Sequence, residues 1–194
     1  MQNHTTPMSA ANSHDRDSVR LILEERAKLL AGTKEKKEEG KEMLEVQAFH
    51  LGAEYLGVPT GMVQEIQRLR SHRWSRVPCA PPFIVGVVNL RGRIYSILDL
   101  AVYWGLPARP VSDSSHLLLV QGVNQRYHEK IELTLLTDDC SEVRFIATDE
   151  LRPPPSTLSA KVQSYLRGVT PEMMLVIDLE LLLSDPDMIV TDGE

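Results

Sequence analysis

The sequence contains little cysteine, few aromatic residues and no long apolar run. Its two cysteines, Cys79 and Cys140, form no C-x-x-C pair, which argues against a zinc framework or a disulfide-rich secreted scaffold. We expect both to be reduced, partly buried thiols. The longest apolar stretches, 83–90 and 173–183, are too short to cross a membrane. Because the polar N-terminus also lacks the apolar segment of a signal peptide, we expect a cytoplasmic protein with no direct membrane insertion.

The sequence also lacks a positive net charge. Lys and Arg number 21 against 27 Asp and Glu, which gives a net charge of -6 and opposes non-specific binding to nucleic acid. We therefore expect no nucleic-acid partner. One stretch runs against this trend, and it suits either an anionic partner or a solvated loop, the commoner use of such residues. Its members are Arg68, Arg70, His72, Arg73, Trp74 and Arg76.

Signatures of catalysis and of metal binding are absent as well. The sequence has no Gly-x-Ser-x-Gly elbow and no phosphate-binding loop. Its six histidines are scattered without the spacing that metal ligands on one helix or strand show. Neighbouring carboxylates such as Asp138 and Asp139 fall in expected turns, where Asp is common because its side chain bonds nearby backbone. The sequence predicts a non-enzymatic protein with no cofactor and no metal.

The first 44 residues differ in composition from the rest. Residues 1–14 are small and polar, so we expect a disordered tail. Over 15–44 the sequence predicts an amphipathic helix, at 18–31, and then a tether rich in Lys and Glu. This helix suits either of two roles, packing on its own domain or docking on a partner. Its apolar residues at helical spacing are Val19, Ile22, Leu23, Ala27 and Leu30.

From residue 45 the apolar pattern shortens to a period of two or becomes continuous, with turn residues at close intervals. We therefore expect a mainly β domain over 45–185 and a C-terminal tail over 186–194. Short helical turns should follow Asp99 and Asp178, since Asp is a good N-cap. The expected strands cover 46–51, 54–58, 62–66, 84–90, 93–98, 116–121, 130–136, 142–146 and 174–177.

A faint internal repeat suggests that the domain has two related halves. Gly86-Val87 opens a segment that ends Ile97-Leu98-Asp99-Leu100, and Gly168-Val169 opens one that ends Val176-Ile177-Asp178-Leu179. Upstream, residues 63–66 and 143–146 stand at almost the same offset. Many short strands of this kind are typical of small barrels.

Asn89-Leu90-Arg91-Gly92 lies between two apolar runs and predicts a hairpin, with Asn89 and Gly92 at positions of positive φ. Gly86, Gly92 and Asp99 are the residues to which we assign structural turns. The hairpin would leave Arg91 at an exposed tip. An arginine held on a rigid turn loses little entropy when it binds a carboxylate or carbonyl of a partner, so Arg91 is a candidate contact.

The whole stretch 77–100 resembles the CheW family of chemotaxis coupling proteins. The family pattern is a Pro-containing entry, an Ile-x-Gly-Val strand, the Asn-Leu-Arg-Gly turn and an apolar strand ending in Asp-Leu, and this chain keeps these elements in order. Residues 49–59, 63–66, 165–169 and 177–179 extend the resemblance over about 45–185. The chain departs from the pattern at Ser96, where the family usually has proline, and at Cys140, where it usually has valine.

The resemblance implies a fold of two small five-stranded SH3-like β-barrel subdomains that share a core, with short helices. It also implies two partners. The cytoplasmic tip of a chemoreceptor would dock in the groove between the barrels, and the regulatory domain of a CheA-type histidine kinase would bind another face. We expect Val87, Asn89, Arg91 and Ile94 near the receptor groove, and recruitment of the cytoplasmic protein to receptor arrays.

Two other readings of the sequence stay open. One is a CheW-like scaffold of a different chemosensory or pilus-motility pathway. The other is a small-ligand-binding β-barrel, which would need convergent polar residues in a pocket, and the sequence shows no such cluster.

Overall fold

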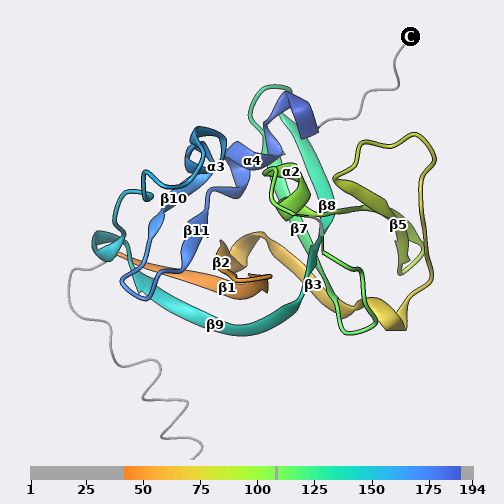
Figure 1. Ribbon diagram of the computed structural model, residues 1–194, viewed down its shortest axis with the longest axis horizontal. Helices are drawn as coiled ribbons and strands as arrows, with labels where there is room; N and C mark the ends of the chain where they lie inside the picture. The colour runs from red at the N-terminus through yellow and green to blue at the C-terminus, as the bar shows by residue number, and fades with distance from the viewer. Residues whose placement is uncertain (1–41, 108, 189–194) are drawn as a thin grey trace, which may run out of the picture. The chain divides into compact units, whose positions relative to one another are not determined.

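The computed structural model describes residues 42–107 and 109–188, which belong to one compact unit that begins at Glu42 (Figure 1). The expected disordered tail and amphipathic helix, most of the tether and the last residues of the expected C-terminal tail lie outside this range. The described fold is slightly longer at both ends than the expected 45–185. Its first strand begins at Met43, and the side chain of Met188 is buried.

Five strands form the first sheet, in the order β10-β11-β2-β1-β9. β1 and β2 are a hairpin, and β2 also pairs in parallel with β11. After β9 a 3-10 turn, η3 (Thr148–Glu150), leads to Arg152, which forms a bridge with Val169 of β10 and so closes the sheet into a barrel. The strands are β1 (Met43–Leu51), β2 (Glu54–Pro59), β9 (Asp139–Ala147), β10 (Leu166–Val169) and β11 (Leu175–Ile177).

Six strands form the second sheet, in the order β3-β7-β8-β6-β5-β4. The short turn η2 (Leu69–Ser71) carries the chain from β3 at one edge to β4 at the other, which closes this sheet as well. The expectation of two small barrels is confirmed, with one more strand here because the two-residue β4 was not predicted. The strands are β3 (Val63–Arg68), β4 (Trp74–Ser75), β5 (Ile84–Leu90), β6 (Arg93–Leu98), β7 (His116–Asn124) and β8 (Glu129–Thr137).

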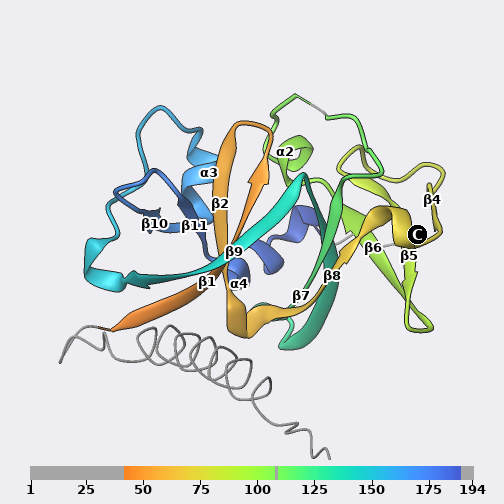
Figure 2. The same ribbon diagram turned by 90° about the horizontal axis from the view of Figure 1, so that it is seen from below.

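Each barrel contains one strand that follows the hairpin of the other. β3 comes directly after the β1–β2 hairpin but pairs with β7, and β9 comes after the β7–β8 hairpin but pairs with β1. Figure 2 shows β3 and β9 leaving their own hairpins in this way. The remaining elements also correspond, since β5–β6 and β10–β11 are antiparallel hairpins that each lead into a helix. The internal repeat seen in the sequence is therefore a repeat of topology.

Gly86 and Gly168 occupy equivalent places in the two halves. Each lies in the first strand of its hairpin, beside a shift in strand register, and neither is part of a turn as was expected for Gly86. A Cβ atom at Gly86 would overlap the carbonyl oxygen of Ser75 in β4, and one at Gly168 would lie 2.8 Å from the carbonyl oxygen of Arg152. Glycine is required here because the segment that closes each barrel passes too close for a side chain.

The two expected helical turns are present, and an aspartate caps each of them. Oδ1 of Asp99 accepts a hydrogen bond from the Ala101 amide at 2.9 Å, and Oδ1 of Asp178 accepts one from the Leu181 amide at 3.2 Å. One helix, capped by Ser159, was not predicted. The helices and remaining 3-10 turns are α2 (Leu100–Tyr103), α3 (Ala160–Ser164), α4 (Leu179–Leu183), η1 (Thr60–Met62) and η4 (Pro186–Met188).

The apolar interior confirms that the two barrels share a core. A central cluster combines β1 and β2 of one barrel with β6, β7 and β8 of the other, and it includes Phe49, Leu98, Leu118 and Ile177. Two smaller clusters fill the individual barrels, one around Val88 and Leu117 and one around Val46 and Val176. Because most of the largest buried side chains belong to the central cluster, neither barrel keeps its full core without the other.

The two cysteines differ from each other. Both are free, as expected. Cys140 is half-buried beside Thr137, and burial raises the pKa of its thiol. Cys79, which was expected to be partly buried, is exposed in the loop before β5 and has a φ of 59°. Its position follows from the neighbouring Pro78 and Pro81, which interrupt pairing at this edge.

Candidate partner-binding surface

Three of the four residues singled out in the sequence share the outer face of the β5–β6 hairpin. Val87 pairs with Ser96 and Asn89 pairs with Ile94, and directly opposed residues of an antiparallel pair lie on the same side. The alternate residues Val88 and Tyr95 point the other way, into the small core of this barrel. Ile94 is 71% exposed, the most exposed large apolar side chain of the described residues.

The hairpin turn consists of Arg91 and Gly92, with φ of 53° and 84°. Positive φ at both positions is typical of the type I′ turns that suit the twist of two-residue hairpins. The expectation that Asn89 would adopt positive φ is wrong, because Asn89 lies in the strand and its Oδ1 accepts a hydrogen bond from the Gly92 amide at 2.8 Å. Arg91 instead adopts the left-handed conformation, at a cost of about 1 kcal/mol for a residue with a Cβ atom.

Arg91 is exposed, as expected, but it is not free. Its Nη2 lies 3.0 Å from Oε1 of Glu65 on β3, and the two side chains are 81% and 13% exposed. Such a pair contributes only about 0–1 kcal/mol to stability. It does hold the guanidinium in one direction while leaving most of its donors in solvent. Sequence analysis missed Glu65 because β3 meets the hairpin tip only in the folded barrel.

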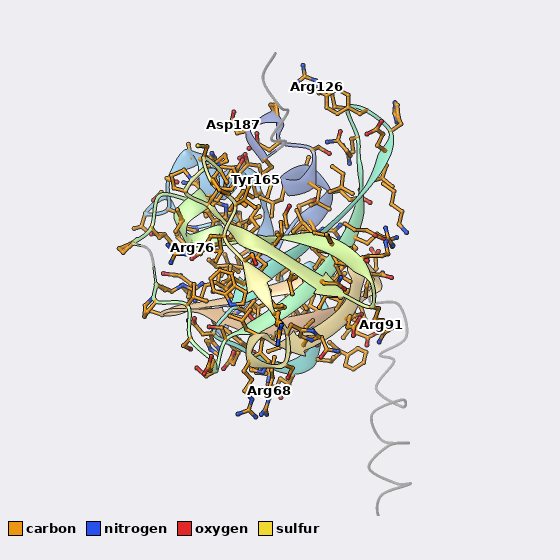
Figure 3. All side chains as sticks on the ribbon, turned by 90° about the vertical axis from the view of Figure 1, so that its right-hand side faces the viewer. Arg68, Arg76, Arg91, Arg126, Tyr165 and Asp187 are labelled. Carbon is orange, nitrogen blue, oxygen red and sulfur yellow. The ribbon has the colours of Figure 1, made fainter. Side chains whose placement is uncertain are left out.

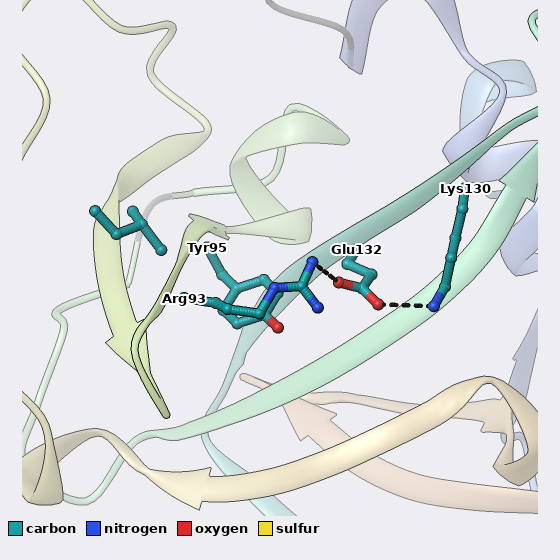
Figure 4. Close-up of a pocket in the computed structure, with 5 residues that line it drawn as sticks. Arg93, Tyr95, Lys130 and Glu132 are labelled. Carbon is teal, nitrogen blue, oxygen red and sulfur yellow. Dashed lines mark ion pairs between the residues drawn. The ribbon is translucent and has the colours of Figure 1, made fainter.

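A second ion cluster lies beside the hairpin (Figure 4). Glu132 of β8 lies between Arg93 and Lys130, with oxygen-to-nitrogen distances of 2.8 and 3.0 Å. The hydrogen bond from Lys130 and the charge of Arg93 hold the pKa of the Glu132 carboxyl below its usual range, against the effect of burial. The Arg93 guanidinium also lies 5.4 Å from the ring centre of Tyr95. Ile94 lines the same hollow, so the exposed apolar residue has fixed charges around it.

The other barrel exposes an apolar face that the sequence analysis did not single out. Val143 and Phe145 point outward from β9, and Met43 of β1 pairs with Ala147 on the same side. Phe145 is 54% exposed, which is unusual for an aromatic side chain in a sheet. The signal in the sequence was the alternation of Val143 and Phe145 with polar residues, which also fits a strand whose apolar side is buried.

The β5–β6 hairpin lies at one end of the unit that the structure describes. Figures 1 and 2 show it on the far side of the six-stranded barrel from β10 and β11. Val87, Asn89, Arg91 and Ile94 therefore lie together on the outside of one barrel. Their expected position beside a groove that receives a partner stays a prediction.

Two other features bear on the kinds of site the protein offers. Within residues 42–107 and 109–188, no three His, Cys, Asp or Glu side chains are grouped closely enough to hold a metal ion. In the same part of the chain, no helix has the length and apolar character needed to span a bilayer.

Comparison with known proteins identifies relatives along most of the chain. The model of the CheW-like domain matches residues 45–187. The chemotaxis protein CheW of Klebsiella aerogenes is 32% identical over 149 residues, which cover 75% of this chain and 84% of the relative. The probable chemotaxis protein CheW of Rhizobium etli is 29% identical over 74% of this chain and 89% of its own length. Protein PilI of Pseudomonas aeruginosa is 24% identical over 76% and 78%.

A solved structure agrees with the fold. The crystal structure of the scaffolding protein TtCheW from Thermoanaerobacter tengcongensis superposes with a TM-score of 0.62 at 24% sequence identity, over 79% of this chain and 96% of that one. This similarity supports the two-barrel fold. Since the domain model covers nearly all the described residues and the Klebsiella relative is matched over most of its length, the chain belongs to the family of CheW-like domain proteins.

Proposed function

We propose that the chain is a non-enzymatic adaptor that couples chemoreceptors to a CheA-type histidine kinase. The observation that carries the proposal is the β5–β6 hairpin, which presents an exposed Ile94 beside an arginine fixed by its turn and by Glu65. Family membership and the chemotaxis proteins among the relatives support it. The protein acts by binding alone, in the cytoplasm, where it is recruited to receptor arrays.

The receptor contact uses the outer face of the hairpin. Val87 and Ile94 supply apolar area to the helical tip of the receptor, and Asn89 and Arg91 supply hydrogen bonds at its margin. The ion pairs of Arg91 and Arg93 fix the direction of charge on this face, which sets the register of a bound helix more than its affinity.

The kinase contact uses a separate face, so that both partners are held at once. The apolar residues Met43, Val143 and Phe145 on the five-stranded barrel are suited to meet the end of a barrel in the kinase regulatory domain. Each contact can be weak, because many such contacts act together in an array.

The alternative function is that of an adaptor in a different signalling pathway. Similarity to Protein PilI supports an adaptor for another chemosensory or pilus-motility system at a lower level of identity. The two readings share the same surfaces and differ only in the receptor and the kinase. Pull-downs with signalling fragments from each candidate pathway separate them, because only the cognate pair is retained on the immobilised protein.

The test of the coupling function is a pull-down and kinase-activation assay with a receptor signalling fragment and the kinase. Wild type should retain both proteins and raise kinase activity. Arg91→Ala should lower receptor binding about tenfold without unfolding the protein. Arg126→Ala is the matched control, since Arg126 is also an exposed arginine in a hairpin turn, between β7 and β8. If wild type retains neither partner from any candidate pathway, the coupling proposal is wrong.

A further inference from the structure

The basic stretch noted in the sequence forms one side of a cavity of about 450 Å³ on the six-stranded barrel. Arg68 ends β3 and Arg70 lies in η2, and both side chains are exposed. The opposite side consists of Asp113 and Ser114, which precede β7, and His116, the first residue of β7. Figure 3 shows the Arg68 side chain extending outward from the barrel. The cavity does not include any residue of the β5–β6 hairpin.

The two sides of this cavity are fixed relative to each other. Arg68 is paired with His116 in the β3–β7 ladder, and the amide of Leu69 donates a hydrogen bond of 2.9 Å to the carbonyl oxygen of Ser115. Leu69, between the two arginines, is buried in the core of the barrel. Both guanidinium groups are therefore carried by rigid backbone, which reduces the entropy lost when they bind an anion.

Within the described residues, no carboxylate forms an ion pair with the arginines at this edge. Among the residues that the structure describes, Arg91, Arg93, Arg109, Arg144 and Arg167 each form an ion pair. Six arginines form none, and four of these are neighbours in the chain: Arg68, Arg70, Arg73 and Arg76, with Arg126 and Arg152 elsewhere. The only carboxylate lining the cavity is the exposed Asp113. In a chain with a net charge of -6, four unpaired arginines within nine residues mark a strongly positive patch.

One buried polar atom in the cavity lining also lacks a partner. In the described part of the chain, Nδ1 of His116 is buried and forms no hydrogen bond. The Ser114 hydroxyl bonds to Ser112 at 2.6 Å and keeps capacity for another hydrogen bond. A ligand with oxygen atoms would meet two guanidinium forks and a hydroxyl.

We propose that this cavity binds the carboxylate side chains of an acidic segment of a partner protein. The two arginines are the main contacts, and Arg73 and Arg76 extend the positive surface along the edge strand β4. Protein carboxylates fit better than nucleic acid, because Trp74 is the one aromatic residue of the stretch and is half-buried and paired in β4. The cavity lining shares no residue with the proposed receptor face, and the proposal does not depend on that face.

The test uses a fluorescein-labelled oligoglutamate peptide and the full-length chain, followed by fluorescence anisotropy at low ionic strength. Wild type should bind the peptide, and the affinity should fall as salt is added. Arg68→Glu and Arg70→Glu should each weaken binding about fivefold or more. Arg126→Glu changes the charge by the same amount at a distant position (Figure 3) and should change the affinity less than about twofold. Circular dichroism checks that each variant is folded.

Three outcomes would overturn the proposal. The first is no binding of oligoglutamate by wild type. The second is an equal loss of affinity in Arg126→Glu, which would show attraction by overall charge only. The third is equally tight binding of a labelled oligothymidylate, which would assign the patch to phosphate backbones and not to protein carboxylates. If Arg70→Glu is unfolded, Arg70→Gln takes its place, since it removes the charge without reversing it.

Discussion

The two barrels of this protein have the same topology but present different chemistry on equivalent strands. Residues 63–66 of β3 and 143–146 of β9 correspond in the repeat, so Glu65 and Phe145 stand at the same position. Glu65 is largely buried and pairs with Arg91, whereas Phe145 is exposed on an apolar face. One barrel therefore offers two fixed ion pairs around its exposed Ile94. The other offers exposed apolar side chains, with the single carboxylate of Glu45 opposite Phe145. A duplicated scaffold can serve two different partners in this way.

The two halves share residues only at positions where the backbone geometry requires a particular residue type. Gly86 and Gly168 both face the segment that closes their barrel, and Asp99 and Asp178 both cap the helix after the second hairpin. The outward residues are free to differ because they do not determine strand pairing. Substitutions at equivalent positions measure how equal the two halves are.

The largest effect is expected at the two glycines. Gly86→Ala should destabilise the protein by roughly 3 kcal/mol, because the new Cβ atom overlaps backbone that cannot move without opening the barrel. Gly168→Ala should cost less, since its Cβ would lie 2.8 Å from the Arg152 carbonyl. Urea denaturation measures both. Gly61→Ala is the control, because nothing lies within 4 Å of its Cβ position. Equal stability of all three variants would contradict this account.

The capping aspartates should be unequal. Asp99 is buried and also lies 3.5 Å from Arg109, whose own side chain is mostly buried, while Asp178 is partly exposed beside Arg167. Asp99→Ala removes a buried cap and one of the two carboxylates that contact Arg109, which keeps its pair with Asp138. It should cost about 2 kcal/mol, against about 1 kcal/mol for Asp178→Ala. Thermal unfolding of the two variants gives the ranking. A larger loss in Asp178→Ala would mean that the Arg109 contact contributes nothing.

The ion pairs of Glu132 with Arg93 and Lys130 should make the stability of the protein depend on pH. Its pKa is lowered in the folded protein below the usual 4.5, mainly by the hydrogen bond from Lys130. The stabilisation is therefore present above the unfolded pKa and is lost as the pH falls through the folded value. Wild type should be more stable than Glu132→Gln at neutral pH, and the difference should shrink below about pH 4.5. Chemical denaturation over a pH series tests this. A difference that grows on acidification would show the opposite shift.

Much of the fold could be predicted from the sequence because its signals are local. Alternating apolar residues located most of the strands, and the Asp-Leu sequences located α2 and α4. β4 was missed because two residues carry too little pattern, and β10 was missed because Arg167 and Gly168 interrupt its apolar residues. The sequence also did not predict that β3 and β9 each pair in the barrel of the other hairpin, because the local residue pattern of a strand does not determine which strand it pairs with.

The candidate site was predictable only in part, for the same reason. The hairpin pattern predicted an exposed Arg91, and the family resemblance singled out Ile94. The pattern misplaced the positive φ, which depends on where the strand ends. Glu65, Glu132 and the cavity beside Arg68 depend on contacts between strands far apart in the chain. Phe145 had an alternating pattern, but which side of β9 is buried is decided by its pairing with β1.

The central claim is that the two barrels bind two different partners through these unlike faces. Ile94→Ser and Phe145→Ser test it most directly, since both replace an exposed apolar side chain and should change stability by less than about 0.5 kcal/mol. Binding of each variant to the receptor fragment and to the kinase regulatory domain is measured separately. We predict that Ile94→Ser loses receptor binding and keeps kinase binding, while Phe145→Ser does the reverse. Loss of the same partner in both variants, or of neither, would contradict the assignment of two faces.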